Sequence, residues 1–231
     1  MKTIGLIGGM SWESTITYYQ LLNEMAKNRL GGLHSAKLIL YSVEFAEMEA
    51  LQASGHWQEA GEVLAQAARS LERAGAECIV LCTNTMHKVA PQITAATHLP
   101  FLHIAEALAE ELNRFSVKKV GLLGTRYTMG ERFYTDILNT AGIEVLVPDE
   151  EDMQVVNNII FNELCCGQVR EESRKAYQAI IEKLVAQGAE GIVLGCTEIG
   201  LLISQRDVPA LPVFDTTQLH AKKAFDFALE N

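Results

Sequence analysis

The stretch GAECIVLCT at residues 75–83 returns as GAEGIVLGC at residues 188–196, an offset of 113 residues. Two further pairs occur in the same order along both halves. IGLIG at 4–8 matches VGLLG at 120–124, an offset of 116, and LPF at 99–101 matches LPV at 211–213, an offset of 112. Three collinear matches at nearly one offset indicate an internal repeat. The chain of 231 residues is therefore predicted to form two similar halves, each the size of a small domain.

Short β-branched runs alternate with longer segments of helical spacing in both halves. The buried strands are expected at 3–7, 37–43, 78–82, 120–123, 145–147 and 192–194, with two more around 101 and 213–214. The helices are expected at 14–28, 57–73, 104–114, 131–140, 155–164, 171–187 and 218–229. This alternation predicts an α/β fold of two pseudosymmetric domains, each a parallel sheet flanked by helices. We expect residues 1–103 plus 215–231 to form the first domain and residues 104–214 the second.

Polar residues follow the predicted strands at the edge where parallel α/β sheets bind ligands. In the first half these are the run Thr83-Asn84-Thr85, with Met10 after the first strand, and in the second half Thr125 and the run Cys196-Thr197-Glu198. If the halves face each other about a pseudo-twofold axis, Thr83 and Cys196 approach one cleft from opposite sides. Such a cleft between the domains suits chemistry on both faces of one atom.

The glycines after the first strand do not form a nucleotide-binding motif. Residues 5–9 lack the G-x-G-x-x-G spacing of dinucleotide sites, and no G-x-x-x-x-G-K-[ST] loop occurs. We expect Gly8 and Gly9 to allow close approach of the backbone to a small ligand. Their N–H groups and the following helix start would favour an anion.

Cys196 is the strongest single candidate for chemistry. It leaves a buried strand beside an expected helix N-terminus, a position that lowers a thiol pKa from about 8.5. Cys78 and Cys82 are expected to be small buried hydrophobes, and the pair Cys165-Cys166 to pack at a helix end. No metal site is expected, because the sequence has no C-x-x-C and its histidines lack ligand spacing.

The histidines and one loop-rich stretch carry weaker signals. His87, His103 and His220 are interpreted as structural in preference to catalytic, since a lone histidine has no spacing signal. Gln52 and Trp57 fall in a stretch around residues 53–56 that is typical of a mobile cover over a ligand site.

Composition excludes several classes of function. With Lys+Arg 19 and Asp+Glu 29 the chain carries a net charge of −10, which disfavours binding to a nucleic-acid backbone. The sequence shows neither a signal peptide nor a transmembrane segment, so no membrane partner is expected. Five cysteines in apolar or glycine-flanked stretches fit reduced thiols, and we expect a cytoplasmic protein.

Three motifs together resemble a known family: TIGLIGGMS at 3–11, CTNTMH at 82–87 and GCTEI at 195–199. With the two-half repeat they resemble the aspartate/glutamate racemase family over essentially the whole chain, and within it the enterobacterial amino-acid racemase branch. The resemblance implies two pseudosymmetric α/β domains with the active site between them, and a homodimer. It also implies a small amino-acid substrate.

What the resemblance implies for mechanism is proton transfer at the α-carbon without a cofactor. One group removes the α-proton and a group on the other face returns one, while donors around the substrate carboxylate stabilise the carbanion. The matching positions that supply such donors are Asn84, Thr85, Thr125 and Thr197. Glu198 is placed to receive the substrate ammonium, and Gln52 and Met10 would line the pocket.

The sequence departs from the commoner family pattern, in which both halves carry cysteine. The first-half position is Thr83, and Cys82, one residue earlier, points to the opposite side. We therefore predict an asymmetric enzyme that favours L-substrates, with Cys196 as the thiolate base and Thr83 as hydroxyl donor or relay on the other face. Turnover from the D-enantiomer should be much slower, and Thr83→Cys should restore it.

Other functions remain open at this point. Arylmalonate decarboxylases and maleate isomerases belong to the same superfamily, and the decarboxylases keep only the second-half cysteine. Against a decarboxylase, the polar run 83–85 and Glu198 suit an amino-acid headgroup. Non-catalytic proteins that bind small ligands are also built from two α/β halves. Such a function does not explain why a cysteine, Cys196, lies at a helix start. The hypothesis of a hydrolase with Cys196 as nucleophile has less support, because the sequence shows no His and Asn or Asp at the spacing of catalytic partners.

Overall fold

The computed structural model describes residues 1–230. They fall into two compact units: unit 1 is Met1–Ile104 together with the residues from His220 onward, and unit 2 is Ala105–Leu219. The first boundary lies one residue later than the expected 103/104 division, and the second lies five residues later than the expected 214/215 division. No helix within residues 1–230 combines the length and apolar character that crossing a membrane requires.

Unit 1 is built on a four-stranded parallel sheet. Its strands are β1 (Ile4–Gly8), β2 (Leu38–Ser42), β3 (Cys78–Leu81) and β4 (Phe101–Leu102), in the order β2-β1-β3-β4. Strands β1 and β3 are buried at every position, because helices cover both faces of the sheet. Their carboxyl ends therefore lie side by side at one edge.

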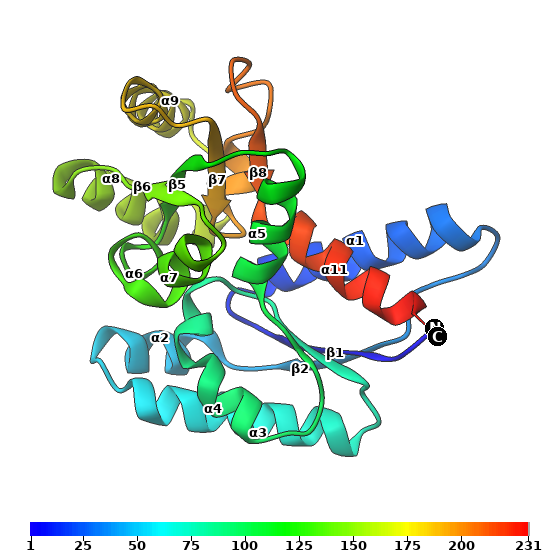
Figure 1. The fold of residues 1–231 in the computed structure, drawn as a ribbon. Coiled ribbons are helices and arrows are strands. Elements are labelled where there is room, and N and C mark those ends of the chain that lie inside the picture. The colour runs from blue at the N-terminus through cyan, green and yellow to red at the C-terminus, as the bar shows by residue number, and fades with distance from the viewer. Residues whose placement is uncertain (231) are drawn as a thin grey trace. The chain divides into compact units, whose positions relative to one another are not determined.

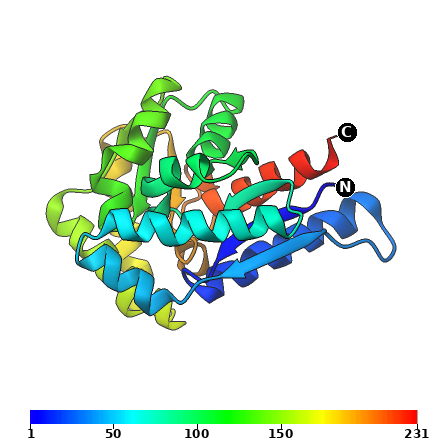
Figure 2. The ribbon, with the colours of Figure 1, turned by 90° about the horizontal axis from the view of Figure 1, so that it is seen from below.

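The helices of unit 1 divide between the two faces of its sheet (Figure 1). On one face, Leu6 and Val80 pack against α1 (Trp12–Leu30) and α11 (Thr216–Leu229). On the other face, Ile7 and Ile79 pack against α2 (Phe45–Ala53), α3 (Trp57–Arg73), the 3-10 turn η1 (Thr85–Val89) and α4 (Ala90–Ala95). Figure 2 shows α3 running along that face. Alternate strand residues thus fill two separate cores, as the period of two demands.

Unit 2 repeats this arrangement. Its strands are β5 (Lys119–Gly124), β6 (Glu144–Leu146), β7 (Gly191–Gly195) and β8 (Val213–Asp215), all parallel, in the order β6-β5-β7-β8. Its core joins β5 and β7 to α8 (Glu150–Asn162) and α9 (Glu171–Ala186). The remaining elements are α5 (Ile104–Arg114), α6 (Arg126–Gly130), α7 (Arg132–Thr140), the 3-10 turn η2 (Leu164–Cys166) and α10 (Ile199–Leu202).

The two sheets match residue by residue. Ile7 pairs with Leu81 in unit 1, and Leu123 pairs with Leu194 in unit 2, so the partners are related by the offsets of 116 and 113 seen in the sequence. The predicted fold class, two pseudosymmetric α/β domains with parallel sheets, is confirmed. Thr83 and Cys196 each lie two residues beyond an equivalent paired residue.

Two local predictions differ from the structure. Residues 45–53 form helix α2, so Gln52 is helical and buried, and only residues 54–56 separate α2 from α3, which begins at Trp57 as predicted. Helix α8 begins at Glu150, five residues before the predicted start, because the Asp149 carboxylate accepts from the N–H of Asp152 and caps it. Three acidic residues in its first turn favour that early start.

Candidate functional site

Three predicted site residues gather at the carboxyl end of β7. The Cys196 thiol donates to Glu198 Oε2 at 3.1 Å, and the Thr197 hydroxyl donates to the same oxygen at 2.5 Å. Cys196 and Glu198 are buried and Thr197 is half-buried. One carboxylate oxygen therefore holds both the thiol and the hydroxyl that follow the strand.

The expectation that Cys196 has a lowered pKa is wrong for this structure. Its pKa is raised well above the usual thiol value, first by burial and then by the negative charge of Glu198, with a smaller contribution from Cys165. The N-terminus of helix α10 was expected to lower this pKa. That helix is only four residues long and begins after Glu198. At neutral pH this cysteine is a thiol whose proton is directed at a carboxylate.

Thr125 follows β5, the strand that neighbours β7 in unit 2. Its hydroxyl accepts from the N–H of Thr128 at 3.3 Å and so caps α6. The side chain is buried. Unit 2 thus brings Thr125, Cys196, Thr197 and Glu198 to the carboxyl edge of its two central strands.

Unit 1 places the equivalent group beyond β3. Thr83, Asn84 and Thr85 are all buried, and the N–H of Thr83 donates to the carbonyl of Leu81 at 2.9 Å. Asn84 precedes η1, which begins at Thr85. These three polar residues therefore lie in a tight turn directly after a buried strand.

Two further predicted residues of unit 1 lie on neighbouring elements. Met10 follows β1 and packs with Met48 in the core on the α3 side, while Gln52 is buried near the end of α2. Whether either contacts a substrate stays a prediction.

The interpretation of Gly9 as an anion-binding amide is wrong. Its N–H donates to Thr15 Oγ1 at 2.8 Å, so helix α1 already uses it. Gly9 has a φ of +92°, and a Cβ there would lie 2.3 Å from the carbonyl oxygen of Val43. At Gly8 a Cβ would lie 2.5 Å from Thr15 Cγ2. Close packing against Val43 and Thr15 requires both glycines.

Cys78 and Cys82 take the structural role expected of them, and Cys165 packs against the core of unit 2, whereas Cys166, expected to pack as well, is exposed. Cys78 and Cys82 are fully buried in the core beneath α1 and α11. Burial raises the pKa of Cys78 to about 12 and that of Cys82 further still. All five cysteines are free thiols. Cys82 therefore cannot replace Thr83 as an acid at the surface of the strand end.

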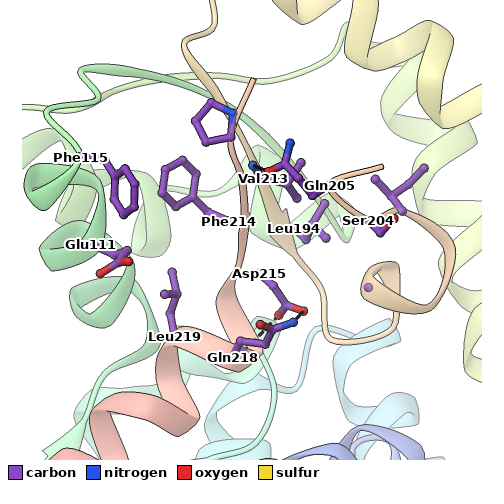
Figure 3. Close-up of a pocket in the computed structure, with 13 residues that line it drawn as sticks. Glu111, Phe115, Leu194, Ser204, Gln205, Val213, Phe214, Asp215, Gln218 and Leu219 are labelled. Carbon is purple, nitrogen blue, oxygen red and sulfur yellow. Dashed lines mark hydrogen bonds between the residues drawn. The ribbon is translucent and has the colours of Figure 1, made fainter. Parts of the chain in front are cut away.

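A cavity of about 390 Å³ in unit 2 contains none of the predicted site residues (Figure 3). Phe115, which directly follows α5, and Phe214 of β8 meet edge to face beside it, with ring centroids 5.9 Å apart. Two carboxylates line the cavity, Glu111 and Asp215, and Asp215 accepts from the N–H groups of Thr217 and Gln218 at the start of α11. Among residues 1–230, no group of three or more His, Cys, Asp or Glu side chains is arranged to hold a metal ion.

His87, interpreted from the sequence as structural in preference to catalytic, lies against the candidate site in the structure. Its ring nitrogen Nδ1 lies 2.8 Å from the carbonyl oxygen of Thr83. Four residues separate Thr83 from His87, which is about one helical turn, and this spacing indicates that His87 could orient a site residue.

Known proteins show similarity to this chain along its whole length. The model of the Asp/Glu/Hydantoin racemase family matches residues 7–224. The broad specificity amino-acid racemase RacX of Bacillus subtilis (strain 168) is 25% identical over 222 residues, covering 95% of each chain. The crystal structure of a suspected Asp/Glu racemase from Yersinia pestis is 57% identical with a TM-score of 0.93, and that of an aspartate racemase homologue from Pyrococcus horikoshii OT3 is 38% identical with a TM-score of 0.86. Both structures are covered fully, as is this chain.

Proposed function

This chain belongs to the Asp/Glu/Hydantoin racemase family, a family of isomerases, and we propose that it is a cofactor-independent amino-acid racemase in which Cys196 and Thr83 act on opposite faces of one substrate. The substrate class we propose is aspartate, glutamate or a related amino acid. The name of the Bacillus relative, a broad specificity amino-acid racemase, supports a substrate range wider than the two acidic amino acids.

One observation carries the proposal: the equivalent positions after β3 and β7 are a threonine and a cysteine that is hydrogen-bonded to a carboxylate. Racemisation needs an acid on one face of the α-carbon and a base on the other. A repeated fold supplies two such positions from one architecture. The pairing of Cys196 with Glu198 gives the second position a route to the thiolate that a lone buried cysteine lacks.

Glu198 is the proton acceptor for Cys196 in this proposal. The Sγ–H proton moves to Glu198 Oε2, the thiolate removes the α-proton of the L-substrate, and the thiol is thereby restored. Glu198 then releases its proton to solvent, which balances the proton that solvent returns through Thr83. The transfer is favoured when the substrate ammonium lies nearer to Cys196 Sγ than to Glu198 Oε2, because a positive charge lowers the pKa of the closer group more.

Thr83 supplies the opposite face. A threonine hydroxyl is too weak an acid to hold a lasting alkoxide, so a proton that it gives to the carbanion must be replaced at once from solvent. The hydroxyl therefore works as the last member of a relay. This makes delivery of the proton on the Thr83 face the slower half of the reaction.

Thermodynamics restricts how this asymmetry can appear. Enantiomers have equal free energies in water, so the equilibrium constant for racemisation is 1. The value of kcat/KM must therefore be the same for the L- and D-substrates. The expected slow turnover of the D-enantiomer can hold only for kcat. The asymmetry is instead visible as isotope exchange without inversion. A deuteron can enter the L-substrate through the Cys196–Glu198 pair each time the slower face fails to complete the reaction.

Incubation of L-amino acids in heavy water, followed by mass spectrometry and chiral chromatography, tests the proposal. We expect deuterium to enter the α-position of at least one L-amino acid faster than its D-isomer forms. Absence of exchange for every L-amino acid would exclude a racemase. Release of CO₂ from an arylmalonate would instead indicate the decarboxylase of the same superfamily.

A further inference from the structure

His87 is buried in unit 1 and joins two segments that are distant in the sequence. Its Nδ1 lies 2.8 Å from the carbonyl oxygen of Thr83, and its Nε2 lies 3.2 Å from the backbone nitrogen of Ile104. The backbone N–H of His87 also donates to the carbonyl of Asn84 at 3.1 Å. One residue therefore holds both carbonyls of the turn after β3 and the first amide of α5.

These contacts determine where the imidazole carries its proton. A carbonyl oxygen only accepts, so Nδ1 must be protonated and donate to Thr83. A backbone N–H only donates, so Nε2 must present a lone pair to Ile104. His87 is thus a neutral imidazole with its proton on Nδ1.

The surroundings of the ring keep it in this state. His103 lies with its ring centroid 4.5 Å from that of His87, and His220 at 5.7 Å. Burial, together with these two neighbours, lowers the pKa of His87 well below its usual value. His220 is itself fixed, since Nε2 donates to the carbonyl of Leu102 at 2.6 Å and Nδ1 accepts from the Tyr18 hydroxyl at 2.8 Å.

We propose that His87 is a positioning residue for the reaction: by holding the Thr83 carbonyl, it sets the orientation of the Thr83–Asn84 peptide and of the two side chains that flank it. In a planar trans peptide the C=O and the following N–H point in opposite directions. A carbonyl held against His87 therefore directs the Asn84 N–H away from the ring. The inference rests on the proposed function, in which Thr83 delivers a proton and Asn84 helps to bind the carboxylate.

The tautomer can be measured without any turnover. Two-bond correlations between imidazole protons and nitrogens, recorded on the full chain labelled with ¹⁵N-histidine, distinguish a protonated nitrogen from an acceptor. We expect the His87 resonances, identified by their loss in His87→Asn, to show a protonated Nδ1 and an unprotonated Nε2. A protonated Nε2 would overturn the proposal, because the Thr83 carbonyl would then lack its donor.

Two variants, both with an amide side chain, distinguish the role of Nδ1 from that of Nε2. In His87→Asn the amide nitrogen occupies the place of Nδ1 and still donates to Thr83. In His87→Gln the longer amide reaches the place of Nε2 and serves Ile104 alone. We expect His87→Gln to slow inversion about 100-fold, the effect of a displacement of about 1 Å at a reacting group, while His87→Asn stays within about tenfold of wild type.

The ratio of inversion to α-hydrogen exchange gives a readout that a merely structural role would not move. It is measured with L-aspartate or L-glutamate, whichever the wild type exchanges faster. His87→Gln should lower this ratio, since exchange depends on Cys196 and inversion also needs Thr83. The matched control is His220→Asn, which removes an equally buried histidine whose ring nitrogens are hydrogen-bonded to Tyr18 and Leu102 instead of Thr83 and Ile104. It should lower the melting temperature without changing the ratio.

The outcomes separate this inference from the proposed function. Equal ratios in His87→Asn and His87→Gln, in an active wild-type background, overturn the positioning role alone. A wild-type chain that exchanges no amino acid overturns the proposed function, and the catalytic consequence of His87 with it.

Discussion

The ends of β3 and β7 occupy equivalent places in two sheets of the same strand order, yet they hold different acids. After β3 a threonine stands in a turn whose carbonyls are held by a histidine. After β7 a cysteine is held by a carboxylate. The comparison teaches that one backbone can place two groups equivalently while the neighbouring side chains decide what each can do with a proton.

A second contrast concerns the buried titratable groups. All six histidines lie outside residues 105–219, so unit 1 has every one and unit 2 has none. His87 and His220 are buried and neutral, with His103 half-buried beside them. The two units should therefore respond differently to acid although their folds match.

The largest effect is expected from Cys196→Ser. A serine hydroxyl cannot form a base near neutral pH, so α-hydrogen exchange should fall about 10⁴-fold, the upper end of what acid–base groups contribute. Chiral chromatography and mass spectrometry measure both exchange and inversion. Cys166→Ser, at an exposed cysteine in the same unit, should stay within about twofold of wild type. Comparable losses in the two variants would contradict a special role for Cys196.

Glu198→Gln should separate acidity from activity. Removing the carboxylate removes a charge that raises the pKa of Cys196, so iodoacetamide should label the thiol at lower pH than in wild type. Exchange should nevertheless fall about 100-fold, because the proton acceptor is lost. A labelling profile that moves to higher pH would be inconsistent with this pairing.

Acid should destabilise unit 1 before unit 2. Burial lowers the pKa of His103 to about 4 and that of His220 to about 3, against about 6.5 unfolded. As pH falls, the unfolded chain takes up protons first, so stability is full above about pH 7.5 and declines below 6.5. Between pH 7.5 and 5 each of these histidines costs on the order of 2 kcal/mol of unfolding free energy.

Hydrogen exchange with mass spectrometry at pH 7.5, 6 and 5, corrected for intrinsic rates, tests this order. Peptides from β1 and β3 should lose protection before those from β5 and β7. Simultaneous loss in both units would show that the histidine cluster does not set acid stability.

The smallest effect is expected at Thr83. Thr83→Cys offers a stronger acid on the slower face, and the inversion rate should rise about tenfold, with kcat/KM increasing equally in both directions. Thr83→Val keeps the shape and removes the hydroxyl, so inversion should fall while exchange into the L-substrate persists. Inversion at the wild-type rate in Thr83→Val would show that the hydroxyl carries no proton.

Much of the fold could be predicted because its signals are local. The helices at 57–73 and 104–114 have the predicted bounds, since their apolar residues recur at helical spacing. Helix α2 was missed, although Glu44 caps it by accepting from the N–H of Glu47. Its nine residues are too few for a periodic pattern to stand out.

The site divides in the same way. The residues after each strand could be identified, because strand ends are predictable and parallel strands end at one edge. The pKa of Cys196 could not, because it depends on burial and on a carboxylate two residues away that turns back onto the thiol. The role of Gly9 was misinterpreted for a similar reason. Glycine is required there because a Cβ would collide with the carbonyl oxygen of Val43, which is distant in the sequence.

The sequence by itself determined the duplication, the two parallel sheets and the asymmetry between Thr83 and Cys196. These follow from repeats, hydrophobic periodicity and residue identity, all of which are properties of the chain before it folds. Only the tertiary structure decided that Cys196 is a thiol paired with Glu198 and that His87 holds the Thr83 turn with its proton on Nδ1. Proton positions depend on desolvation and on partners distant in the sequence, and folding alone brings those together.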